Sequence, residues 1–220
     1  MEDFVKKNIF FLIILLIVFC FSMHISAGVS WERVYEGQID GRQLNAAYTN
    51  GINRSRPALV DIDNDGDDDM FVGSEMNGIS YYRNDGTSNT PDWVFVTDHY
   101  STYPGSNSSP AFADIDNDGD YDMFIGKQDG SISYLRNDGT SSSPSWQSVT
   151  ENYNSIDVGN NSALSFIDID NDGDQDMFIG EYGGNINFYR NDGTPASPTW
   201  TLATENYNSI DVGDMSTPAF

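Results

Sequence analysis

The sequence is poor in basic residues. It has 10 Lys and Arg against 34 Asp and Glu, which gives a formal net charge of -24 over 220 residues. A protein that binds the phosphate backbone of nucleic acid relies on clusters of Lys and Arg, and a surface this acidic repels that backbone. We therefore expect no nucleic-acid partner.

Cysteine and histidine are almost absent. The chain has one cysteine, Cys20, and after the first 30 residues its only histidine is His99. Disulfides therefore cannot cross-link the region after Cys20, and bound metal is the obvious substitute. The shortage of histidine removes most routes to Ser-His-Asp triads, His-based general bases and His-rich zinc or iron sites.

Long apolar runs are also missing, except near the N-terminus. There, Lys6 and Lys7 precede an apolar run over residues 9–21, and small residues follow around Ala27. This pattern predicts a secretory signal peptide over residues 1–27. An uncleaved anchor is the alternative, but a membrane-spanning helix needs about 20 apolar residues. We expect a secreted, extracellular or cell-surface protein, or a periplasmic one, with no membrane span after cleavage.

Helical periodicity is absent, and an internal repeat dominates instead. "DIDNDGDDDMFVG" begins at Asp61, "DIDNDGDYDMFIG" at Asp114 and "DIDNDGDQDMFIG" at Asp168, offsets of 53 and 54 residues. Each unit reads as four short strands separated by turn signals. Strands such as "MFIG" are apolar on both faces, as a sheet between two neighbouring sheets requires. The repeat predicts an all-β fold, a β-propeller whose four-stranded sheets, or blades, are about 53–54 residues long.

The expected organisation has four parts. After the signal peptide, residues 28–56 form an N-terminal outer strand and loop that would close the last blade. Three blades follow over residues 57–109, 110–163 and 164–217, and a fourth is cut off at 218–220. A closed propeller needs at least four blades. We therefore expect an incomplete or open set of roughly three and a half blades, and a fragment of a longer chain.

Aromatic residues keep the same step along the chain. Trp93, Trp146 and Trp200 repeat at 53 and 54 residues, and a tyrosine follows each of them seven positions later. Such residues can pack one blade against the next or stack on ligand sugars. We favour packing, because the fold needs it in every repeat.

The acidic loops match the pattern DxDxDGxxD. Alternating aspartates on a tightly wound loop can converge on one point, which would leave strong repulsion without a cation. The glycine permits the sharp bend, and the residue at position 7 can add its backbone carbonyl. The predicted ligands are Asp61, Asp63, Asp65, Asp67 and Asp69 in the first loop, Asp114, Asp116, Asp118, Asp120 and Asp122 in the second, and Asp168, Asp170, Asp172, Asp174 and Asp176 in the third.

Calcium is the cation that these ligands favour. It accepts six to eight oxygens in flexible geometry, whereas magnesium demands a stricter octahedron. An EF-hand would need a glutamate at position 12, where the chain has Val72, Ile125 and Ile179. Solvated Asx turns are the alternative, but three copies in register argue against them. About three calcium ions are expected.

The segments "PALVDIDNDGDDDMFVG", "PAFADIDNDGDYDMFIG" and "ALSFIDIDNDGDQDMFIG" resemble the FG-GAP and VCBS repeats of integrin-α-like propellers. The resemblance covers nearly all of residues 28–220. It implies that each calcium loop is a hairpin joining the first two strands of a blade. It also implies a structural role for calcium and ligand recognition on the faces of the propeller.

These patterns together predict a calcium-binding adhesion or interaction module with an extracellular protein or carbohydrate ligand. The alternative is the propeller domain of an extracellular polysaccharide lyase or hydrolase. We expect no enzyme, because the repeated metal loops account for every conspicuous Asp cluster, whereas a catalytic site should break the repeat at one blade. Arg42, Arg54 and Arg56 lie in the one irregular segment and could bind an acidic ligand, although an exposed loop is the favoured interpretation.

Overall fold

The computed structural model describes residues 37–39, 42–44, 55–75, 78–100 and 106–220. The expected signal peptide, the outer strand near Trp31, and Arg54 lie outside these residues. The chain divides into two compact units, Met1–Gly51 and Ile52–Phe220. In the first unit, β1 (Gly37–Ile39) and β2 (Arg42–Leu44) pair as an antiparallel hairpin.

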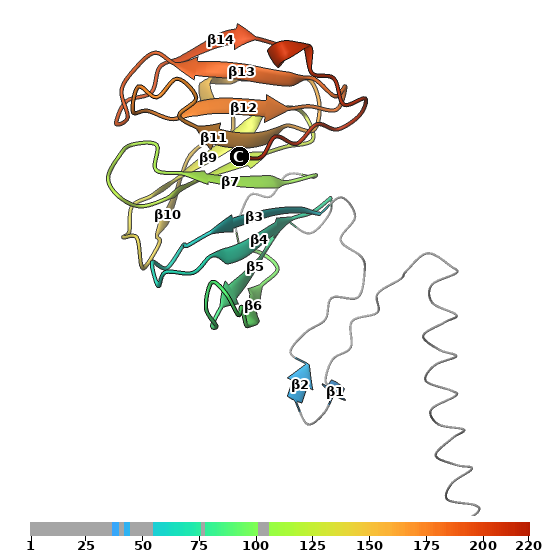
Figure 1. The fold of residues 1–220 in the computed structure, drawn as a ribbon, viewed down its shortest axis with the longest axis vertical. Coiled ribbons are helices and arrows are strands. Elements are labelled where there is room, and N and C mark those ends of the chain that lie inside the picture. The colour runs from blue at the N-terminus through green and yellow to red at the C-terminus, as the bar shows by residue number, and fades with distance from the viewer. Residues whose placement is uncertain (1–36, 40–41, 45–54, 76–77, 101–105) are drawn as a thin grey trace, which may run out of the picture. The chain divides into compact units, whose positions relative to one another are not determined.

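The described part of the second unit consists of three four-stranded antiparallel sheets, in which strands follow one another in chain order (Figure 1). This confirms the all-β class and the incomplete set of propeller blades. The first sheet contains β3 (Arg56–Val60), β4 (Asp69–Gly73), β5 (Ile79–Asn84) and β6 (Trp93–Thr97). The second contains β7 (Ser109–Ala113), β8 (Asp122–Gly126), β9 (Ile132–Asn137) and β10 (Trp146–Thr150). The third contains β11 (Ala163–Ile167), β12 (Asp176–Gly180), β13 (Ile186–Asn191) and β14 (Trp200–Thr204).

Two short 3-10 turns complete the described elements. They are η1 (Tyr153–Ser155) and η2 (Tyr207–Ser209), each just after the outer strand of its sheet. Both lie in the segment "TENYNSIDVG", which occurs twice in the sequence. The same ten-residue sequence therefore forms the same turn in two neighbouring blades.

The hydrophobic core lies between the sheets. Strand β8 shows why the repeat is apolar on both faces. Met123 and Ile125 pack with residues of the first sheet, whereas Phe124, on the opposite face, packs with residues of the third sheet. Each of these three side chains is fully buried. Because successive residues of a strand point to opposite faces, a sheet covered on both sides needs apolar residues at both odd and even positions of its strands.

Aromatic residues connect neighbouring sheets, as expected. Phe112 of the second sheet lies 4.7 Å from Phe71 of the first, measured between ring centroids. The Trp146 indole N–H donates to the Tyr100 hydroxyl at 3.1 Å, across the same boundary. Trp200 makes the equivalent bond to Tyr153 at 2.9 Å. The prediction that these residues pack the blades is confirmed for Trp146 and Trp200.

The glycine that ends each "FVG" or "FIG" strand has a steric role. A Cβ atom on Gly73, Gly126 or Gly180 would lie 2.0–2.2 Å from the carbonyl oxygen of a serine that begins the following blade segment. At the first boundary, this close approach accompanies a backbone hydrogen bond from the Ser108 N–H to the Ser74 carbonyl at 3.1 Å. The glycines therefore let one blade segment dock directly on the preceding sheet.

Candidate metal centre

Each acidic loop joins the first two strands of a sheet and is folded by its own backbone. In the first loop, Asn64 and Gly66 both adopt positive φ, 59° and 97°. This left-handed conformation suits glycine and, among other residues, asparagine. The Asp61 carboxylate accepts the N–H groups of Asp65 at 3.1 Å and Gly66 at 3.0 Å, and Asp65 accepts the N–H of Asp67 at 3.1 Å. Both other loops repeat these bonds.

The folded loop brings carboxylates together at one point. One oxygen from each of the aspartates at positions 1, 3 and 5 lies within 4.8 Å of the other two, in all three copies. The groups are Asp61, Asp63 and Asp65; Asp114, Asp116 and Asp118; and Asp168, Asp170 and Asp172. The predicted ligands at these positions therefore converge as the spacing indicated.

Several carboxylate oxygens of the loops are buried without a hydrogen-bond partner. They are Oδ1 of Asp63, Asp67, Asp116, Asp120 and Asp174. Asp120 and Asp174, at position 7, are only 7% and 6% exposed. A buried charged oxygen costs free energy unless it is hydrogen-bonded or coordinates a cation. From the sequence, only the backbone carbonyl of position 7 was expected to be a ligand. The structure adds the carboxylate of this residue as a further oxygen that could bind a cation.

Crowding also changes the acidity of these groups. Burial, followed by the charge of the neighbouring Asp118, raises the pKa of Asp120 to about 6. Burial and the charge of Asp172 raise the pKa of Asp174 to about 6 in the same way. Asp63 and Asp116 also have raised pKa values, with burial as the largest cause. A cation among these groups would favour their charged forms.

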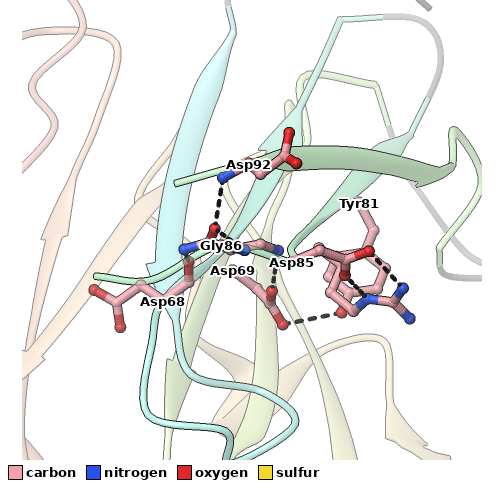
Figure 2. A network of polar contacts seen from close by, with 8 residues as sticks. Asp68, Asp69, Tyr81, Asp85, Gly86 and Asp92 are labelled. Carbon is pink, nitrogen blue, oxygen red and sulfur yellow. Dashed lines mark hydrogen bonds and ion pairs between the residues drawn. The ribbon is translucent and has the colours of Figure 1, made fainter. Parts of the chain in front are cut away.

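The aspartate at position 9 lies at the start of the second strand and is bonded to the third. Asp69 is 1% exposed, and its two oxygens accept the Tyr81 hydroxyl at 2.9 Å and the Asn84 N–H at 2.7 Å (Figure 2). Asp122 has the same partners in Tyr134 and Asn137. Asp69, Asp122 and Asp176 thus fix the loop to its sheet, next to the converging triads.

Sequence reasoning missed the role of the asparagine in the repeated "RNDGT" segment. The buried Asn84 donates its N–H to Asp69, while its side-chain oxygen accepts the N–H groups of Gly86 at 3.1 Å and Asp92 at 2.9 Å (Figure 2). Asn137 and Asn191 make the same bonds. The identical repetition of "RNDGT" was the available signal.

Arg56 differs from the expectation of an exposed loop. It is 8% exposed, and its guanidinium donates to the carbonyl oxygens of Ser162 at 3.0 Å and of Asn107 and Asn161 at 3.5 Å each. Arg56 begins the innermost strand of the first sheet, and its partners directly precede the innermost strands of the other two. The side chain therefore connects three blades. Arg42 lies in β2, where side chains are not described.

The fold and the loops define a bladed repeat protein with an acidic hairpin in every blade. The model of the FG-GAP-like repeat family matches residues 61–125 and 116–179, which together span more than half of the chain. The chain belongs to the FG-GAP-like repeat family. A search of the curated proteins finds no significant match. Membership in this family indicates an extracellular interaction module, and its repeats often bind calcium. Within the described ranges there is no helix long and apolar enough to cross a membrane.

Proposed function

We propose that this chain is a secreted or cell-surface interaction module whose three acidic hairpins each bind a calcium ion that stabilises a blade. The observation that carries the proposal is the set of buried, unpartnered carboxylate oxygens beside each converging triad. Calcium prefers oxygen ligands of this kind and tolerates their irregular arrangement. When bound, it would supply the positive charge that the crowded carboxylates require.

The chain's own residues prepare each site. In the second loop, the Asp114 carboxylate holds the N–H groups of Asp118 and Gly119, which fixes the turn. Asp116 contributes an oxygen to the converging triad, and Asp120 keeps a buried oxygen without a hydrogen-bond partner in the same loop. Asp122 fastens the loop to its sheet. The ion would be held by the triad and by position 7, with Asp122 beside them. Stabilisation, rather than catalysis, is the role that suits three equivalent sites.

The ligand of the module is proposed to be an extracellular protein or carbohydrate. A glycoside hydrolase would use a pair of carboxylates that is distinct from the repeated loops. The converging Asp groups among the described residues all belong to the repeat. We therefore propose that the chain binds its ligand without turning it over.

Calcium stoichiometry tests this proposal. Calorimetric titration of the metal-free chain should give three sites, and Asp116→Asn should leave two, because it removes a charged ligand from the second loop only. Asp214→Asn is the matched control, since Asp214 is an exposed aspartate outside the three loops. Unchanged stoichiometry in Asp116→Asn, or an equal loss in Asp214→Asn, would contradict the assignment.

A further inference from the structure

We propose that a groove between the second and third acidic hairpins binds a neutral saccharide. The inference rests on the proposed function, since it names the ligand class of that module. The groove has a volume of about 320 Å³. Its walls include Phe112, Asn117 and Tyr121 of the second blade and Asp174, Gln175 and Pro195 of the third.

The lining has the mixed character of a small-ligand site. Tyr121 and Pro195 provide apolar surface, and the Asn117 and Gln175 amides provide donors and acceptors. Pockets of about 300–1,000 Å³ with apolar walls and a few polar groups are typical of small-molecule sites. A sugar ring presents an apolar C–H face and a rim of hydroxyls. The C–H face of the sugar can stack on an aromatic ring, and its hydroxyls can hydrogen-bond to the amides.

Tyr121 is the side chain best placed to provide a stacking surface. It is 42% exposed and lies at position 8 of the second loop, between two residues of the metal-binding pattern. An exposed tyrosine offers a large rigid surface with one polar end, which is why tyrosine is common at binding surfaces. No packing requirement of the repeat accounts for it, because the equivalent residues are Asp68 and Gln175.

The repeat is broken at this groove, on both of its walls. The residue equivalent to Pro195 is Ser88 in the first blade and Ser141 in the second, and Tyr121 likewise differs from its counterparts. The aspartates of the metal-binding pattern, by contrast, are identical in all three loops. Residues that the fold requires recur in every blade, so departures that meet in one groove indicate a specialised surface.

Charge selects a neutral ligand for this groove. Asp114 and Asp174 line it, and the whole chain carries a net charge of -24, so a sulfated or uronic-acid glycan would be repelled. Within the described residues no arginine lines it. Arg83, Arg136 and Arg190 each pair with an aspartate two positions along the chain. The tyrosine, proline and amide side chains of the lining favour a sugar over a basic peptide.

The test uses the whole chain after signal cleavage, in saturating calcium and in chelator. Neutral hexasaccharides of glucose, mannose and galactose are screened by saturation-transfer NMR, beside heparin and a lysine-rich peptide. We expect one neutral hexasaccharide to bind. Tyr121→Ala should weaken its affinity about tenfold, in the manner of a truncated aromatic anchor. Tyr121→Phe should retain it. Tyr182→Ala is the matched control, because Tyr182 is 48% exposed on the β12–β13 turn, at the opposite end of its sheet from the hairpins.

Several results would overturn the saccharide site. These are no binding of any neutral hexasaccharide, equal affinity in wild type and Tyr121→Ala, and binding only of heparin or the basic peptide. Calcium stoichiometry measured on the same samples separates the two proposals. Three calcium sites without saccharide binding would refute the groove and leave the calcium module intact. Saccharide binding that depends on Tyr121 in a chain that binds no calcium would support the groove and refute the metal sites.

Discussion

The second and third acidic loops have the same metal-binding pattern but rest on different supports. In the second, the Tyr134 hydroxyl donates to the buried Asp122 at 2.9 Å. In the third, Phe188 stands at the position of Tyr134, and Asp176 accepts the Ile169 N–H at 3.3 Å instead. The ring packing is nearly the same in both blades, since Tyr134 stacks on Phe124 at 4.8 Å and Phe188 on Phe178 at 4.6 Å.

The aromatic residue of the third strand has two roles in a blade. Its aromatic ring fills the core between sheets, which either tyrosine or phenylalanine can do. Its hydroxyl supports the loop, which only tyrosine can do. Burial raises the pKa of the Tyr134 hydroxyl, with the charge of Asp122 as a further cause, so the group remains a proton donor. The third loop should therefore be the less rigid of the two.

The largest expected effect is that of removing calcium. A ligand that binds only the native state contributes about 2.7 kcal/mol at a hundredfold excess over its dissociation constant, so each occupied loop should add about this amount. Chelation should lower the melting temperature measured by calorimetry. The third loop should lose its ion at a lower chelator concentration than the second. The second loop is intact in Asp170→Asn, and the third loop is intact in Asp116→Asn. If both variants lose calcium at the same chelator concentration, the proposed difference between the two loops is wrong.

The second prediction concerns the hydrogen bond that supports the second loop. Tyr134→Phe deletes a hydrogen bond to a buried charged group, so it should lower the free energy of unfolding by about 1.5–3 kcal/mol. It should also raise the pKa of Asp122, which the Tyr134 hydroxyl holds down. Denaturant titration in chelator measures the effect without the contribution of calcium.

The reverse exchange, Phe188→Tyr, should have a smaller effect of the opposite sign. It offers Asp176 a hydroxyl, but this carboxylate already accepts the N–H groups of Asn191 and Ile169. An increase of about 1 kcal/mol in the free energy of unfolding is expected, as for an average hydrogen bond. Destabilisation by Phe188→Tyr would show that the two blades do not share one arrangement.

The last prediction concerns pH, and the sign of the effect depends on calcium. Burial raises the pKa values of Asp69 and Asp122 to about 6, above the ordinary aspartate value of 3.8. In the metal-free chain the native state therefore binds these protons more tightly than the unfolded state, and stability should rise as the pH falls from about 7 towards 4. With calcium bound, acidification should lower stability, because protons compete with the ion. Unfolding curves at several pH values, with and without chelator, measure both slopes. The same slope in both conditions would contradict the metal assignment.

The sequence predicted those features that repetition makes visible. The strands, the hairpins and the convergence of Asp61, Asp63 and Asp65 all follow from a local pattern seen three times. The support of Asp69 by Tyr81 and Asn84 was not predicted, because residues 12 and 15 positions apart meet only when two strands pair. The burial of Arg56 was not predicted either, since its partner Ser162 lies 106 residues away in the sequence.

The contacts at Gly73, Gly126 and Gly180 have a consequence for the order of folding. Each sheet leaves one apolar face open until the next segment docks on its glycine, so a blade is completed by residues that leave the ribosome after it. Phe71 is covered by Phe112, and Phe124 by Phe166, in each case by a strand that follows the sheet in the chain. Repeat proteins of this kind are stabilised by nearest-neighbour interfaces and fold by propagation. During synthesis, the chain should therefore become stable in steps of one blade, each step one repeat behind the segment just made.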